Sequence, residues 1–87
     1  MEIIKFSAEW CGPCKAYKNI FDKVVSKYSD ITVIEADVDK DAGITVKYGI
    51  ISVPTTIIAK NDVELDRITG LILERDLKST IDKYINI

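Results

Sequence analysis

Two apolar patterns alternate along this chain: short continuous runs, and segments in which apolar residues recur every three or four positions. Continuous runs are typical of buried strands, and the wider spacing is typical of one face of a helix. They predict strands at about 3–6, 31–38, 54–59 and 64–69, and helices at about 12–28 and 73–85, with a short helix ending near 48. The order βαβαββα predicts an α/β domain in which helices cover a sheet.

The first helical segment starts on a Cys-Gly-Pro-Cys stretch. Pro13 suits the first turn of a helix, because the N–H that proline lacks would have no helical partner there. The apolar stripe of this helix is expected to consist of Tyr17, Ile20, Phe21, Val24, Val25 and Tyr28. Both cysteines therefore belong to the N-terminal end of an amphipathic helix.

Polar and turn residues mark the other boundaries. Asp39 and Asp41 are expected to cap the short second helix, and Gly49 to end it. The Asn61-Asp62 pair predicts a turn that joins the third and fourth strands into an antiparallel hairpin. The last helix is expected to have Glu74 and Asp76 in its first turn and the buried stripe Leu73, Leu77, Ile81, Tyr84 and Ile85.

Composition then narrows the class of protein. With 87 residues, 47% hydrophobic and 30% charged, the chain is expected to form a single domain over 1–87, as a monomer. A net charge of −2 argues against nucleic acid or an anionic membrane as partner. The first residues lack the pattern of an export signal, which leads us to expect a cytoplasmic protein.

The absence of histidine excludes Ser/His/Asp and Cys/His catalytic arrangements and imidazole metal ligands. Two cysteines do not supply a four-ligand zinc site, so no metal is expected. Chemistry must therefore come from the cysteine pair itself.

Cys11 and Cys14 are three residues apart at a helix start, which brings their Cα atoms to about 5–6 Å, within the range of a disulfide. Free N–H groups and the helix dipole stabilise a thiolate there and lower the pKa of the outer cysteine. We assign Cys11, at the exposed first position, as the nucleophile, and Cys14 as the less exposed resolving thiol. Pro13 stiffens the loop and favours a reducing potential. A static disulfide is the alternative, although so short a loop constrains little chain entropy.

The stretch Ala8-Glu9-Trp10-Cys11-Gly12-Pro13-Cys14-Lys15 resembles the active-site signature of the thioredoxin family. The resemblance continues through Asp37-Val38-Asp39, Lys47-Tyr48-Gly49-Ile50, Val53-Pro54-Thr55 and Gly70. It implies a thioredoxin fold and a thiol–disulfide oxidoreductase that needs no cofactor beyond its redox-active disulfide. A thioredoxin reductase would reduce it, and protein disulfides, such as those of ribonucleotide reductase, would receive the electrons.

The same resemblance implies a cis peptide bond between Val53 and Pro54 that lies against the disulfide. It also implies an apolar lip that holds a partner polypeptide, made of Trp10, Gly12, Pro13, Val53, Pro54, Gly70 and Leu71. The backbone before Pro54 would pair with an extended substrate segment. For Trp10 the alternative is a core aromatic, but its neighbours Glu9 and Gly12 favour the rim.

The chain departs from the thioredoxin pattern in length, because no residues are available for the strand and helix that usually precede the strand at 3–6. We therefore expect a four-stranded mixed sheet with helices on both faces and the strand at 31–38 as an edge. In size the chain resembles a glutaredoxin.

It also departs in charge, since Lys5 stands where thioredoxins usually have a buried aspartate, and Glu35 where they usually have a lysine. Our hypothesis is a swapped ion pair behind the disulfide, in which Glu35, or a water that it orients, relays the proton of Cys14. The alternative is two solvated charges. Lys15 matches the family and would either add positive potential near Cys11 or be a solvated helix lysine.

Other functions stay open at this point. The size favours a glutathione-coupled, glutaredoxin-like reductase, whereas Gly-Pro between the cysteines disfavours it. A thioredoxin-fold binding module with incidental redox activity would keep its function without the cysteines. An oxidase or isomerase, and an iron–sulfur cluster shared across a dimer, are further alternatives.

Overall fold

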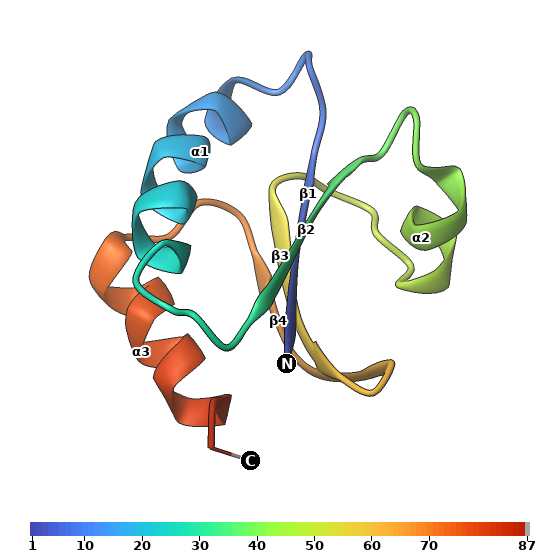
Figure 1. Ribbon diagram of the computed structural model, residues 1–87. Coiled ribbons are helices and arrows are strands. Elements are labelled where there is room, and N and C mark those ends of the chain that lie inside the picture. Colours follow the sequence, from blue (N-terminus) through green and yellow to red (C-terminus); the bar gives the residue numbers. More distant parts are fainter. Residues whose placement is uncertain (87) are drawn as a thin grey trace.

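The computed structural model describes residues 1–86, which form a four-stranded mixed sheet in the order β2-β1-β3-β4 (Figure 1). The elements are β1 (Glu2–Ser7), α1 (Gly12–Val25), β2 (Thr32–Asp37), α2 (Ala42–Lys47), β3 (Thr55–Lys60), β4 (Val63–Thr69) and α3 (Glu74–Tyr84). β1 runs parallel to β2 and antiparallel to β3, and β3 and β4 form an antiparallel hairpin. The predicted order of elements is confirmed, and β2 is an edge strand as expected.

Helices cover both faces of this sheet, with α1 and α3 on one side and α2 on the other (Figure 1). Because side chains alternate along a strand, β1 contributes to two separate cores. The core under α1 and α3 consists of Ile3, Tyr17, Phe21, Val24, Leu77 and Ile81. The core on the α2 side consists of Ile4, Phe6, Ala36, Tyr48, Ile57 and Ala59.

Helix ends differ from the expected positions at two places. α1 ends at Val25 rather than near residue 28, and the N–H of Ser26 donates to the carbonyl of Asp22. Leu73 was expected in the buried stripe of α3, but it is 61% exposed. It is the N-cap residue with an extended backbone, so its side chain does not lie on the helix face.

The expected aspartate caps of α2 are wrong. Asp41 is the N-cap residue, but its side chain makes no cap hydrogen bond; its carboxylate accepts the N–H of Asp37 at 2.8 Å instead. The carboxylate of Asp39 likewise accepts a hydrogen bond from another part of the chain, the indole N–H of Trp10. Gly49 follows α2 with φ +59°, in the left-handed region that favours glycine, as its predicted role as a helix stop requires.

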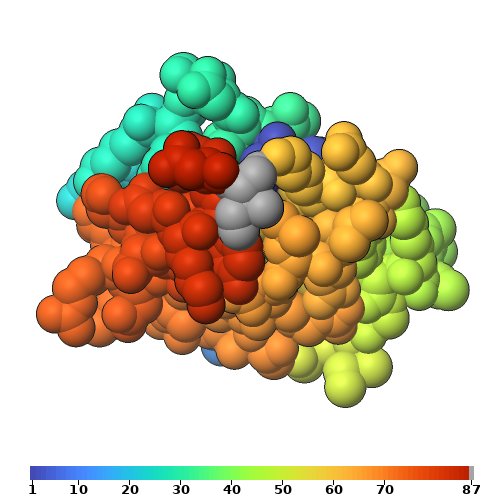
Figure 2. Space-filling view, turned by 90° about the horizontal axis from the view of Figure 1, so that it is seen from below, coloured from blue at the N-terminus to red at the C-terminus, as the bar shows by residue number. Residues whose placement is uncertain are grey.

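The β3–β4 hairpin turns at Asn61 and Asp62, as predicted, with φ values of 52° and 65°. This hairpin and α3 cover much of the end of the molecule from which β1 starts (Figure 2). Within residues 1–86, no helix is both long enough and apolar enough to span a membrane.

Candidate active site

The two cysteines lie at the point where β1 gives way to α1, and they form a disulfide with a Cα–Cα distance of 5.3 Å. This distance confirms the spacing expected from the sequence. Cys11 is the N-cap residue of α1, and its sulfur accepts the backbone N–H of Cys14 at 3.2 Å. A helix N-terminal donor therefore points at the sulfur of Cys11.

The expected difference in exposure between the cysteines is wrong, because Cys11 is 4% exposed and Cys14 is 6% exposed. Cys11 belongs to a buried cluster with Ala8 and Cys14, against which Val38 and Val53 pack, and its Sγ lies 3.7 Å from the carbonyl oxygen of Val53. In the disulfide form, what sets the two cysteines apart is the backbone donor on Cys11 rather than exposure.

The loop opposite the disulfide contains Pro54, and the Val53–Pro54 peptide bond is cis, as the resemblance implied. The contact between Val53 and Cys11 places this bond against the disulfide. Two hydrogen bonds hold the loop: the N–H of Gly70 donates to the carbonyl of Pro54 at 2.8 Å, and the Thr55 hydroxyl donates to the carbonyl of Ser52 at 2.7 Å.

Exposed side chains surround the cysteines. Trp10 is 70% exposed, which confirms its expected place on a rim rather than in a core. Its indole N–H donates to Asp39 at 2.8 Å and ties the active-site loop to the loop before α2. Gly12, Pro13 and Leu71 are exposed, Val53 and Gly70 are half-buried, and Pro54 is buried.

Behind the disulfide, Lys5 and Glu35 are direct neighbours in the β1–β2 register. The ammonium of Lys5 lies 2.7 Å from a Glu35 carboxylate oxygen, and the two side chains are 5% and 55% exposed. The same ammonium lies over the ring of Phe21, 5.0 Å from its centre. The expected pairing is present. Two solvated charges do not describe it, because Lys5 is buried on the α1 side of the sheet.

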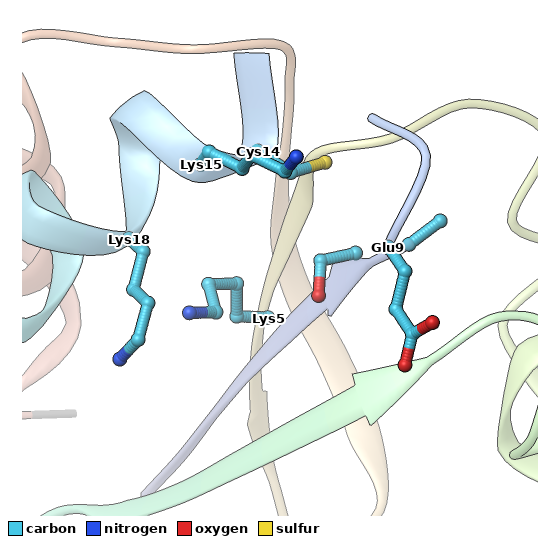
Figure 3. A pocket seen from close by; sticks show the side chains of 7 residues that line it. Lys5, Glu9, Cys14, Lys15 and Lys18 are labelled. Atoms are coloured by element: carbon cyan, nitrogen blue, oxygen red, sulfur yellow. The ribbon is translucent and has the colours of Figure 1, made fainter. Parts of the chain in front are cut away.

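A cavity of about 140 Å³ lies between β1 and the first turns of α1. It is lined by Lys5, Ser7, Ala8, Glu9, Cys14, Lys15 and Lys18. Figure 3 shows Lys5 extending from β1 on the side where Cys14 and Lys18 lie, with Glu9 turned away from them. Lys18 pairs with Asp22 at 2.6 Å, which raises the pKa of Lys18, while Lys15 is exposed.

Three features of this region were missed from the sequence: the cavity, Ser7 and the position of Lys18. Ser7 lies two residues beyond Lys5 and four beyond Ile3, so strand alternation alone places it on the same face. Another polar link was missed as well. The Tyr17 hydroxyl of α1 shares a hydrogen bond of 2.8 Å with the Thr56 hydroxyl of β3, and burial raises the pKa of Tyr17.

Among the described residues, no group of three or more cysteine, aspartate, glutamate or histidine side chains is arranged to hold a metal ion. The chemistry that this arrangement can perform is disulfide exchange at Cys11 and Cys14. The thioredoxin family model matches residues 1–83.

Related proteins give the same picture. The chain is 35% identical to a thioredoxin of Porphyra purpurea over 85 residues, which are 97% of this chain and 79% of that protein. It is 32% identical to thioredoxin 1 of Synechococcus elongatus over 84 residues, 95% of this chain and 78% of that one. The oxidised thioredoxin of Plasmodium falciparum matches with a TM-score of 0.84 and 36% identity over 95% of this chain and 79% of that chain.

Proposed function

This chain belongs to the thioredoxin family of thiol–disulfide oxidoreductases, and from that premise we propose that Cys11 is the nucleophile and Cys14 the resolving thiol. The hydrogen bond from the Cys14 N–H to the Cys11 sulfur carries this assignment. A backbone donor at a helix N-terminus stabilises negative charge on the sulfur that it reaches, and the thiolate is the form that attacks a disulfide.

The reaction would proceed in two exchanges. In the reduced protein, the Cys11 thiolate attacks one sulfur of a partner disulfide, and the other partner sulfur leaves as a thiolate and takes up a proton. The Cys14 thiolate then attacks the Cys11 sulfur in the mixed disulfide. The Cys11–Cys14 bond forms, the second partner sulfur is released, and the partner has gained two electrons and two protons.

We propose that the partner polypeptide lies on the lip formed by Trp10, Gly12, Pro13, Val53, Pro54, Gly70 and Leu71. The exposure of Trp10 and Leu71 and the contact of Val53 with Cys11 support this arrangement. An extended segment beside the backbone before Pro54 would bring its disulfide up to Cys11. Pro13 would keep the loop stiff, and Lys15 would add positive potential near Cys11.

The proposed electron donor is a thioredoxin reductase, and the proposed acceptors are disulfide-containing proteins such as ribonucleotide reductase. The Cys11–Cys14 disulfide would be the only redox group that the reaction needs. We propose a cytoplasmic location. An organelle is the alternative location, since matched relatives from spinach and Chlamydomonas reinhardtii are named as chloroplastic. Cell fractionation distinguishes the two locations.

The test is reduction of insulin disulfides by the purified protein, with NADPH and thioredoxin reductase in one arm and with glutathione and its reductase in the other. We expect activity in the first arm, its loss in Cys11→Ser, and stable mixed disulfides in Cys14→Ser. Activity in the glutathione arm alone would support a glutaredoxin-like reductase. Full biological activity of a Cys11→Ser/Cys14→Ser variant would support a binding module.

A further inference from the structure

The exposed large apolar side chains of this protein fall into two groups. The bulkier ones, with exposed fractions from 41% to 97%, are Trp10, Ile51, Leu71 and Leu73. The others among residues 1–86 are valines, namely Val33 on β2, Val46 on α2 and Val63 on β4. The bulkier side chains lie on loops, and the direction of the strands shows where these loops are.

The loop that leads into β3 and the loop that follows β4 lie at the cysteine end of the sheet (Figure 1). β3 is antiparallel to both β1 and β4, so it begins at the end where the other two strands finish. The N–H of Gly70 joins the two loops by donating to the carbonyl of Pro54 at 2.8 Å. Ile51 lies three residues before Pro54, and Leu73 lies three residues after Gly70. Because three extended residues span about 10 Å, both lie within about that distance of this bond.

The same two loops carry no charge, although 30% of the chain is charged. Neither 48–59 nor 68–73 contains aspartate, glutamate, lysine or arginine. Glu74, which follows the second segment, is paired with two lysines of α1 at 3.2 Å each. Charges around the cysteines belong to other segments, among them Glu9, which pairs with Lys40 at 3.1 Å. One side of the site is therefore uncharged and exposes large apolar side chains.

Leu73 occupies a position at which stability favours a polar residue. It is the N-cap residue of α3 and makes no side-chain hydrogen bond to the helix. Serine, threonine, aspartate or asparagine would accept an N–H of the first turn, whereas leucine leaves that N–H to water. Residues that break such a local rule are expected at functional sites. The missing cap is a second observation, besides exposure, that indicates a role for Leu73 in contact with a partner.

We propose that Ile51 and Leu73 extend the apolar lip and select polypeptides that carry large apolar side chains within two or three residues of the reacting cysteine. The inference rests on the proposed docking of the partner beside Pro54. The reaction supplies the occupant, because a segment bearing a disulfide has to lie beside Cys11 to react. Two or three extended residues of that segment span up to about 10 Å, which matches the reach of the lip to Ile51 and Leu73. Burial of apolar surface on both partners stabilises this complex, and a small polar side chain gains nothing there.

The experiment uses short peptides whose single cysteine is linked by a disulfide to thionitrobenzoate. A thiolate of the reduced protein attacks the peptide sulfur, the S–S bond breaks, and thionitrobenzoate leaves as a coloured anion. The second thiolate of the protein then displaces the reduced peptide and closes the protein disulfide. Two peptides differ only in the two residues on each side of the cysteine, which are leucine in one and serine in the other. The same mixed disulfide made from free cysteine is the reference, and stopped-flow absorbance gives each rate constant.

We expect the leucine peptide to react about 10-fold faster than the serine peptide, within the range that apolar contacts provide. Ile51→Ser and Leu73→Ser should each lower this ratio by about threefold, the effect of partly burying one large apolar side chain. Val46→Ser and Val63→Ser are the matched controls, since each removes an exposed apolar side chain from another element, and the ratio should not change. Equal rates for the two peptides, or an unchanged ratio in Ile51→Ser and Leu73→Ser, would overturn the proposal.

Leu73→Ser also separates binding from stability. Serine supplies the missing cap, so the urea midpoint of unfolding should rise while the preference for the leucine peptide falls. A lower midpoint would show that Leu73 is kept for stability and would overturn its assignment.

The free-cysteine reference separates this inference from the proposed function. Absence of reaction with all three substrates would overturn the proposed function, and this inference with it. Reaction with the reference and equal rates with both peptides would overturn this inference alone.

Discussion

The two faces of β1 differ sharply, although they are built from alternate residues of one short strand. Towards α2, the strand presents Ile4 and Phe6, which are buried in an entirely apolar core. Towards α1, it presents the apolar Ile3 and then the polar Lys5 and Ser7, which are nearer the cysteines in sequence. One strand therefore has an apolar face towards α2 and a face towards α1 on which core and polar residues occur together, because each face meets a different set of neighbours.

The largest effect is expected on the apolar face. Phe6→Ala removes a fully buried ring that packs edge-on against Tyr48, with ring centres 6.1 Å apart. We expect the free energy of unfolding to fall by about 3–5 kcal/mol in chemical denaturation. A loss below about 1 kcal/mol would show that this face contributes less to stability than its burial indicates.

A smaller effect is expected at Tyr17, which lies on the α1 side of the sheet, one helical turn beyond Cys14. Tyr17→Phe removes the hydrogen bond to Thr56 and leaves that buried hydroxyl without this partner, at a cost of about 1–2 kcal/mol at neutral pH. Equal stability of the two proteins at neutral pH would contradict a role for this bond.

The difference should also depend on pH. Burial raises the pKa of Tyr17 above its ordinary 10.0, so the unfolded chain loses this proton first, and stability falls as the pH rises above that value. Tyr17→Phe should lose less stability than the parent protein in denaturation measured across this alkaline range. An equal loss of stability in both proteins would mean that a group other than Tyr17 causes the alkaline sensitivity.

The smallest effect on stability is expected at Lys5. Removing one member of a fully buried ion pair is costly, because it leaves the other charge without compensation. Here the remaining Glu35 is 55% exposed and hydrated, so Lys5→Met should change the free energy of unfolding by less than about 1 kcal/mol. Denaturation by urea measures it. A loss of several kcal/mol would mean that Lys5 is a structural residue, and the contrast between the two faces would disappear.

Much of this arrangement could be predicted from the sequence because it depends on local pattern. The continuous apolar run at 3–6 predicted the first strand, and the helical spacing of Tyr17, Phe21 and Val24 predicted the first helix and its buried face. The spacing of Cys11 and Cys14 at a helix start was sufficient to predict their Cα separation. Such features require only the geometry of a single element.

The features that could not be predicted depend on contacts between distant segments. Cys11 is buried because residues from two other loops close over it, which its position at a helix start does not reveal. Asp41 bonds to Asp37 rather than capping α2, because the turn after β2 brings that N–H to its carboxylate. The burial of Lys5 likewise follows from the packing of α1 across β1.

The opposite end of the sheet offers a practical advantage. The N-terminus, the β3–β4 hairpin and the end of α3 lie together at the end away from the cysteines (Figure 1). Fluorescent labels, affinity tags or surface tethers attached there would leave the Trp10 rim open to large protein substrates. The molecule can therefore be immobilised through its N-terminus or the β3–β4 hairpin and still present its disulfide outward, as a reusable probe for capturing the proteins that it reduces.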